Sequence, residues 1–216
     1  MNNIKVSVII PVYNQEKLII KAIESIPKRS DIEIIVIDDG STDNTWNKLL
    51  QYTNNHEELI NFILLYNKEN KGVAYTVNKG YDNANGEYVV LLGSDDYFYT
   101  DKFNEIIKYL NGTDLVYFNL QINNGDIWRL TKENKTGLCG SVKFMKREFI
   151  NGTRCPEEKQ AGEDYYFYQD LLKKNPSETF TDITLKHYNY PRQGSLTYLL
   201  KKGLLKKWKI YSILGI

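Results

Sequence analysis

Two pairs of adjacent aspartates stand in the first half of the sequence, each close behind an apolar run. Asp38 and Asp39 follow one such run, and Asp95 and Asp96 follow another. Neighbouring carboxylates repel one another unless a cation or hydrogen-bond donors balance their charge. Oxygen ligands of this kind suit Mg²⁺ or Mn²⁺, which usually complete their coordination with phosphate oxygens. The four aspartates therefore predict a metal-assisted site for a diphosphate.

The elements that must position these aspartates alternate between buried strands and amphipathic helices. Apolar runs predict strands at 6–11, 32–37, 59–66 and 87–92, and helical spacing predicts helices at 14–26, from 41 or 43 to about 52, and at 73–84. This alternation predicts a single-domain α/β fold, with a Rossmann-like, mostly parallel central sheet flanked by helices on both faces. Ligands bind at the carboxyl ends of such strands, where both aspartate pairs would meet.

The pattern becomes less regular after residue 99. A helix is expected at 101–110, short strands at 115–120 and 127–130, one short element near 142–150, and a helix at 163–174. The residues from 131 to 162 are mostly polar and are expected to be loop around that short element. Because the sequence has no internal repeat and no long linker, we expect one domain rather than two.

Several protein classes lack support in the sequence. There is no Gly-x-Gly-x-x-Gly after the first strand, no P-loop and no Gly-x-Ser-x-Gly elbow. His56 and His187 are far apart and form no zinc pattern. Two cysteines are too few for a disulfide framework and indicate a reducing compartment. No run of 18 apolar residues exists, so we expect no membrane-spanning helix. The sequence begins Met-Asn-Asn-Ile-Lys and enters a predicted strand at once, so we expect no signal peptide.

Five short motifs, taken in order, resemble the family-2 glycosyltransferases. They are VSVIIPVYN at 6–14, DDGSTD at 38–43, NKG at 70–72 and 78–80, GEYVVLL at 86–92, and SDD at 94–96. Their order and spacing match the family across residues 4–99, and weaker matches follow at 162–164 and 188–195. The resemblance implies an A-type glycosyltransferase fold. Its catalytic domain would span 1–197, with a nucleotide-sugar-binding half at 1–99 and an acceptor half at 100–197.

The resemblance also implies roles for individual residues. Those that would contact the donor nucleotide or its diphosphate are Pro11, Tyr13, Asp38, Asp39, Asn70, Gly72, Asn78, Ser94 and Arg192. Asp39 would accept a hydrogen bond from the base, and Asp95 with Asp96 would hold Mn²⁺ or Mg²⁺. Asp164 would be the general base for the acceptor hydroxyl, and its neighbour Glu163 is the alternative. A carboxylate among aromatic neighbours can have a raised pKa, which suits a base.

The reaction that the resemblance implies is an inverting, metal-dependent transfer of a sugar from a nucleotide-sugar, taken to be a UDP-sugar. The acceptor would be a hydroxyl of a glycan or lipid-linked saccharide in cell-surface polysaccharide synthesis. A polyprenyl-phosphate glycosyltransferase is an alternative, because that acceptor needs no base.

Two positions depart from the family pattern. Gly93 stands where the family often has the first aspartate of Asp-x-Asp, and Val77 stands where it often has arginine. Lys71 and Arg192 are candidates to replace that missing positive charge. A second alternative is therefore a catalytically impaired protein that still binds a nucleotide-sugar.

The formal net charge of +1 hides an uneven distribution. Residues 183–216 hold seven basic side chains and no acidic one, whereas the first 182 residues hold 21 basic and 27 acidic ones. The segment 198–216 predicts an amphipathic helix, with Leu204 and Trp208 on one face and lysines from Lys201 to Lys209 on or beside the other. Such a helix can bind an anionic membrane surface or pack on the domain. We favour the membrane, hence a cytoplasmic protein that is peripheral on the inner face, and expect no nucleic acid.

Overall fold

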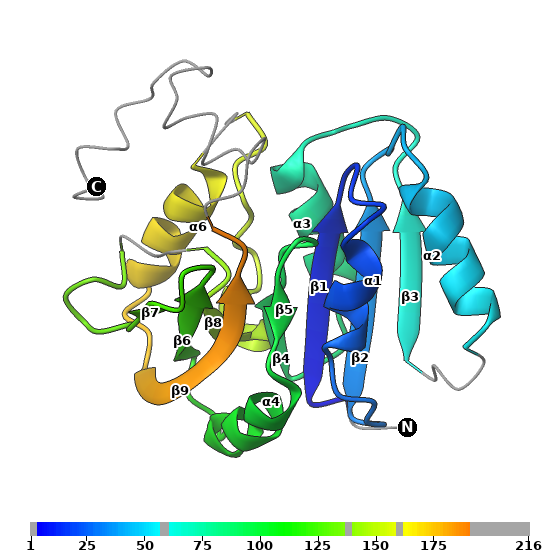
Figure 1. Cartoon of the computed structure of the whole chain (residues 1–216). Coiled ribbons are helices and arrows are strands. Elements are labelled where there is room, and N and C mark those ends of the chain that lie inside the picture. Colours follow the sequence, from blue (N-terminus) through cyan, green and yellow to red (C-terminus); the bar gives the residue numbers. More distant parts are fainter. Residues whose placement is uncertain (1–3, 57–60, 137–139, 159–161, 191–216) are drawn as a thin grey trace.

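The computed structural model describes residues 4–56, 61–136, 140–158 and 162–190. Its strands are β1 (Val6–Val12), β2 (Ile32–Asp38), β3 (Phe62–Tyr66), β4 (Tyr88–Leu91), β5 (Tyr97–Phe98), β6 (Leu115–Ile122), β7 (Ile127–Trp128), β8 (Lys143–Lys146) and β9 (Glu178–Tyr188). Its helices are α1 (Ile19–Glu24), α2 (Thr45–Asn54), α3 (Val73–Asn83), α4 (Thr100–Ile106), the short 3-10 helix η1 (Ile107–Tyr109), α5 (Arg147–Ile150) and α6 (Glu163–Leu172). The strands form one sheet in the order β3-β2-β1-β4-β8-β6-β9-β5, and β7 pairs with β6 (Figure 1).

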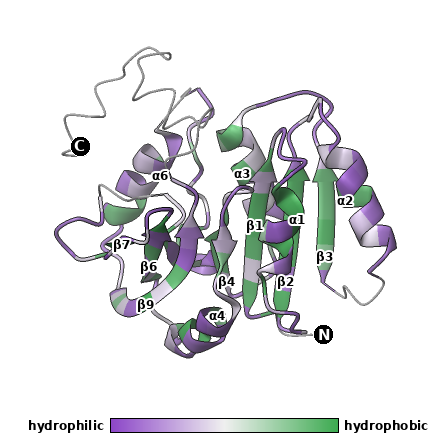
Figure 2. Cartoon of the chain, in the orientation of Figure 1, coloured by the Kyte–Doolittle hydropathy of each residue, from purple (hydrophilic) through white to green (hydrophobic). Residues whose placement is uncertain are grey.

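The first four strands are parallel, as their sequence pattern predicts. β1 pairs with β2 and β4, and β2 pairs with β3. Along β1, Val8 and Ile10 pack into one core cluster while Ile9 between them packs into the other, and all three are fully buried. The first cluster includes side chains from α1, α2 and α4, and the second includes side chains from α3, α5 and α6. Helices therefore cover both faces, which explains why these strands are mostly apolar (Figure 2).

The second half of the chain extends the same sheet and makes it mixed. β8 is antiparallel to both β4 and β6, β9 is parallel to β6, and β5 is antiparallel to β9. Two strand pairings therefore join the halves on either side of residue 99, β4 with β8 and β5 with β9. β9 was not expected from the sequence. Polar residues make up at least half of this strand, and most of its residues are only partly buried. Its pairing with β6 is interrupted by register shifts.

Element boundaries differ from expectation at α1, which begins at Ile19 instead of near residue 14. Asn14 has a left-handed backbone (φ 52°), and the N–H groups of Gln15 and Glu16 donate to Thr45 and Asp43. These contacts hold the segment as a loop that reaches the carboxyl end of β2. The predicted helix at 198–216 and Arg192 lie outside the described residues.

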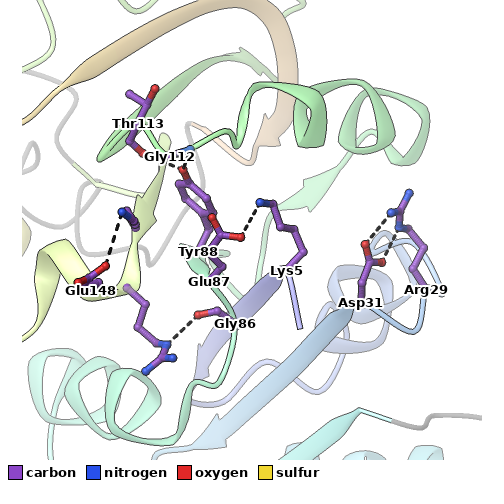
Figure 3. A network of polar contacts seen from close by, with 11 residues as sticks. Lys5, Arg29, Asp31, Gly86, Glu87, Tyr88, Gly112, Thr113 and Glu148 are labelled. Atoms are coloured by element: carbon purple, nitrogen blue, oxygen red, sulfur yellow. Dashed lines mark hydrogen bonds and ion pairs between the residues drawn. The ribbon is translucent and has the colours of Figure 1, made fainter. Parts of the chain in front are cut away.

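Polar contacts hold the amino ends of β1 and β4 in place (Figure 3). The aspartate pairs lie at the other end of these parallel strands. The Lys5 ammonium lies 2.6 Å from the Glu87 carboxylate. The Tyr88 hydroxyl donates to the Thr113 carbonyl at 3.0 Å and accepts from the Gly112 N–H at 2.7 Å. The polar groups at the amino ends of these strands are thus paired within the protein. The candidate ligand-binding residues lie at the carboxyl ends.

Candidate active site

Asp39 joins the end of β2 to the loop 67–72. Its Oδ1 accepts hydrogen bonds from Asn67 Nδ2 and the Lys71 N–H, and its Oδ2 accepts one from the Gly72 N–H, each at 2.9 Å. The residue is only 4% exposed. A carboxylate has about four acceptor positions, so these three bonds leave one on Oδ2. The geometry therefore suits an Asp39 that holds the loop and accepts one more N–H from a ligand.

Asp38 shapes the turn beside it. Its side chain is fully buried, and Oδ1 accepts from the Ser41 N–H at 2.7 Å, while Oδ2 has no hydrogen-bond partner among the described residues. Burial raises the pKa of Asp38, against the opposing effect of its hydrogen bonds from Ser41. Gly40 (φ +70°) then brings the chain so close to the next loop that a Cβ there would lie 2.6 Å from the Glu69 carbonyl carbon.

Asn14 ties the loop after β1 to the loop after β2. Its side-chain oxygen accepts from the Thr42 N–H at 2.8 Å, and its own N–H donates to Ser41 Oγ at 2.9 Å. The neighbouring Tyr13 is 41% exposed, and Pro11 is partly buried in β1 near the same edge. The loops after β1, β2 and β3 are therefore bonded into one rim that leaves the Tyr13 ring accessible.

Asn70 and Gly72 form the start of α3. Asn70 Oδ1 accepts from the Gly72 N–H at 3.1 Å, the same N–H that donates to Asp39. Gly72 has φ +89°, a backbone conformation that residues with a side chain adopt at a cost. The amino end of α3 thus lies against the Asp39 carboxylate, which accepts the Gly72 N–H there.

Asn78 lies away from this rim. Its amide oxygen accepts from the Cys155 N–H and its amide nitrogen donates to the Cys155 carbonyl, both at 2.9 Å, and the nitrogen also donates to Glu157 at 3.0 Å. These bonds hold the 153–157 segment onto α3. Both ends of the amide are thus engaged within the protein, and a nucleotide contact of Asn78 stays a prediction. Val77 is buried in the apolar core beside it.

The turn after β4 carries the second pair of aspartates. The Asp96 N–H donates to the Gly93 carbonyl at 3.0 Å, and Ser94 within the turn is buried. A Cβ at Gly93 would lie 2.8 Å from Asp96 Oδ2 and 3.2 Å from Asp95 Oδ1. Both carboxylates therefore fold back over the Gly93 backbone. Gly93 therefore leaves the space that these two carboxylates occupy, in addition to lacking the carboxylate that the family often has at this position.

The carboxylates of Asp95 and Asp96 differ in their surroundings. Asp96 Oδ2 lies 3.2 Å from Lys186 Nζ, and Oδ1 accepts from the Asn189 N–H at 2.9 Å. Burial raises the pKa of Asp96, and the Lys186 charge opposes that shift. Asp95 is less buried in the same turn. Protein groups thus engage both oxygens of Asp96, whereas Asp95 sits nearer the surface.

Asp95 fits a divalent cation better than Asp96 does. Within the part of the chain that the structure describes, no three His, Cys, Asp or Glu side chains group as a metal site. Mg²⁺ is often held by one or two carboxylates, with substrate phosphates and water as its other ligands. One hard oxygen donor at a strand end matches that mode, and Asp95 is the less buried carboxylate of the two.

Glu163 and Asp164 form the first turn of α6. Asp164 Oδ1 accepts from the Tyr165 N–H at 2.8 Å, and its Oδ2 faces Gly140, where a Cβ would lie 3.0 Å away. Burial, and then the charge of Asp164, raises the pKa of Glu163 to about 7. Glu163 therefore gains or loses a proton near neutral pH directly beside Asp164.

Two residues of this region escaped sequence reasoning. Asn67 bonds Asp39 and is itself held by Lys79, whose Nζ donates to Asn67 Oδ1 at 2.8 Å. The signal for Asn67 was present, because it directly follows a strand as the aspartates do. Lys186 gave no such signal, because it lies in the unexpected strand β9. Arg192 remains a prediction outside the described residues.

A model of the family described as "Glycosyl transferase family 2" matches residues 7–173. The chain belongs to glycosyl transferase family 2. The motif resemblance is thereby confirmed. An uncharacterized glycosyltransferase of Haemophilus influenzae is 32% identical over 191 residues, which cover 81% of this chain and 74% of that protein. The UDP-Glc:alpha-D-GlcNAc-diphosphoundecaprenol beta-1,3-glucosyltransferase WfgD of Escherichia coli is 30% identical over 225 residues, 97% of this chain and 86% of WfgD.

Two other relatives are much longer than this chain. An uncharacterized glycosyltransferase of Rickettsia felis is 39% identical over 119 residues, which make up 54% of this chain and 19% of that protein. A relative from Rickettsia conorii is 38% identical, also over 119 residues, which again make up 19% of that protein. The chain therefore spans about a fifth of these two relatives.

Solved structures share the fold. Residues 1–349 of S. aureus TarS, crystallised with UDP-GlcNAc, superpose with a TM-score of 0.75 at 24% identity, over 89% of this chain and 60% of that one. The mannosyltransferase PcManGT from Pyrobaculum calidifontis, in complex with GDP-Man and Mn²⁺, gives 0.71 at 20% identity, over 93% and 61%. The predicted α/β fold with a largely parallel sheet is confirmed, with β8 and β5 as antiparallel strands.

Proposed function

We propose that the chain transfers a sugar from a nucleotide-sugar, specifically a UDP-sugar, to a hydroxyl of a glycan or lipid-linked saccharide, with inversion at the anomeric carbon. The observation that carries this proposal is the rim in which Asp39 and Asn14 bond the loops after β1, β2 and β3. The turn that carries Asp95 follows β4, which is parallel to β1 and pairs with it, so this turn lies at the same carboxyl end of the sheet. Membership of glycosyl transferase family 2 supports the same reaction.

The donor would lie along this edge. Tyr13 and the end of β1 at Pro11 would contact the base, whose N–H would donate to the remaining acceptor position of Asp39. The diphosphate would extend past Ser94 toward Asp95. Asp95 would hold Mn²⁺ or Mg²⁺, which when bound neutralises charge on the departing diphosphate.

Asp164 would act at the acceptor. The acceptor oxygen forms a bond to the anomeric carbon as the bond from that carbon to the diphosphate oxygen breaks, and the hydroxyl proton passes to Asp164. Direct displacement from the face opposite the leaving group inverts the carbon. The neighbouring Glu163, with its pKa raised to about 7, is protonated in part at neutral pH, which limits charge repulsion beside Asp164.

The proposed acceptor is supported by WfgD, whose name describes transfer from UDP-Glc to a diphosphoundecaprenol-linked GlcNAc. We propose a lipid-linked saccharide of surface polysaccharide synthesis as the acceptor here. The protein would work in the cytoplasm and bind the inner membrane surface through Lys201–Lys209. None of the helices among the described residues has the length and apolar character to cross a bilayer.

Two observations bear on the impaired-enzyme alternative. Val77 packs in the core, so a longer side chain would not fit there without rearrangement. Gly93 is packed by both aspartates of its turn. The fold thus accommodates both departures, so neither points to a disrupted site.

The test is a transfer assay with UDP-sugars and a synthetic GlcNAc-diphospholipid, with the product detected by mass spectrometry. A product whose mass increases by one sugar supports the proposal. Nucleotide binding without transfer to any saccharide acceptor favours the impaired protein. Transfer to polyprenyl phosphate that persists in Asp164→Asn favours the other alternative.

A further inference from the structure

Lys186 is the most deeply buried cation near the candidate site. It lies on β9 and is 1% exposed. Its Nζ lies 3.2 Å from Asp96 Oδ2 and donates to Ser141 Oγ at 2.5 Å. Sequence reasoning gave this residue no role, and the reaction proposed above does not use it.

A buried ion pair contributes little net stability. Removing two charges from water costs several kcal/mol for each ion, and an apolar pair of similar size is often at least as stable. Buried pairs can instead fix one arrangement of neighbouring segments. The question is therefore which segments the ammonium of Lys186 holds together.

Lys186 links the turn that carries Asp95 to the loop that faces Asp164. On one side it bonds Asp96, next to Asp95, and the Asn189 N–H holds the other oxygen of Asp96. On the other side it bonds Ser141, next to Gly140, which packs against Asp164 Oδ2. The Gly140 carbonyl also accepts a hydrogen bond from Lys143 Nζ at 3.3 Å.

We propose that Lys186 is a positioning residue that sets the place of Asp95 relative to Asp164 through Asp96 and Ser141. The inference rests on the proposed function, in which Asp95 lies at the diphosphate and Asp164 at the acceptor. Lys186 touches neither substrate. Its loss would let the two loops move independently.

The test compares Lys186→Met with the double variant Lys186→Met/Asp96→Asn. The single variant leaves Asp96 buried without its cation, so a loss of stability is expected from charge burial alone. The double variant has no unpaired buried charge and is expected to recover most of that stability. Lys135→Met is the matched control, because it breaks a part-buried ion pair with Glu178 at the far end of β9.

Amide hydrogen exchange at 93–96 and 140–142 gives a readout that needs no activity. We expect faster exchange in both segments for the single and the double variant, and wild-type exchange there for Lys135→Met. In both Lys186 variants, Mn²⁺-dependent UDP affinity should fall roughly tenfold or more, as when a group that orients a metal ligand is removed. The turnover number should fall as well, because Asp164 is no longer held.

A double variant with wild-type exchange, UDP affinity and turnover would overturn the proposal, since the ion pair would then serve stability alone. Failure of the proposed function looks different. A wild-type protein without Mn²⁺-dependent UDP binding would refute the donor site, while exchange at 93–96 and 140–142 would still decide whether Lys186 couples the two loops.

Discussion

The Asp39 carboxylate accepts a 2.9 Å hydrogen bond from the backbone N–H of Gly72, which joins the carboxyl end of β2 to the start of α3. Asn67 and Lys71 add two more donors to the same carboxylate. A residue of the candidate base-binding site is therefore also the main polar link between two loops. Binding and local stability should change together when it is altered.

Replacing Asp39 by alanine tests this link. The Lys71 N–H loses its acceptor and the Gly72 N–H keeps only Asn70 Oδ1, which should lower the free energy of unfolding by about 1–3 kcal/mol. UDP affinity should fall roughly tenfold or more, since a lost hydrogen bond and a displaced loop act together. Calorimetry and urea denaturation measure the two effects. Asp31→Asn, which alters an exposed pair with Arg29 at the opposite edge, should leave UDP affinity unchanged.

The two adjacent aspartates of the next turn should behave differently from each other. Asp95→Ala should abolish the increase in UDP affinity that Mn²⁺ produces and leave metal-free binding intact. Asp96→Asn should mainly destabilise the fold, by about 3 kcal/mol, because Lys186 keeps a buried charge without its partner. UDP titrations with and without Mn²⁺, beside denaturation curves, separate these results. Unchanged Mn²⁺-dependent affinity in Asp95→Ala would refute the metal assignment.

The sequence was most informative where each strand is buried on both faces. The apolar runs of β1 and β2, and the polar residues directly after them, predicted both the parallel sheet and the edge where Asp39 lies. The prediction failed at β9, because half of its residues are polar and it packs irregularly on β6. Lys186 was missed for that reason. The bonds of Asn78 to Cys155 could not be foreseen either, since they join segments 77 residues apart.

The acidic residues at the start of α6 can be told apart by their effect on catalysis. Asp164→Asn should reduce turnover by two orders of magnitude or more, roughly the contribution of a general base. Glu163→Gln should keep activity and lose any change of kcat/KM centred near pH 7, because the amide cannot titrate as Glu163 does there. Rate profiles from pH 5 to 9 measure this. The reverse pattern, with Glu163→Gln inactive, would make Glu163 the base.

Glu163 should also make stability depend on pH. Its folded pKa of about 7 exceeds the ordinary value of 4.5, so the folded state binds more protons between these values. The free energy of unfolding should therefore fall as pH rises from about 4.5 to 7, by about 3 kcal/mol at most. Glu163→Gln stays neutral and should lose this dependence, becoming more stable than the wild type at pH 8. Parallel stability curves for the two proteins would contradict the shift.

The most direct measurement for the whole account is a donor screen that follows release of UDP, GDP or dTDP from their sugars with Mn²⁺ and a lipid-linked saccharide present. The account predicts UDP release from at least one UDP-sugar, matched by acceptor glycosylation and lost in Asp95→Ala and Asp164→Asn. Release that survives in both variants, or no release from any donor by a protein that binds none of the three nucleotides, would contradict it.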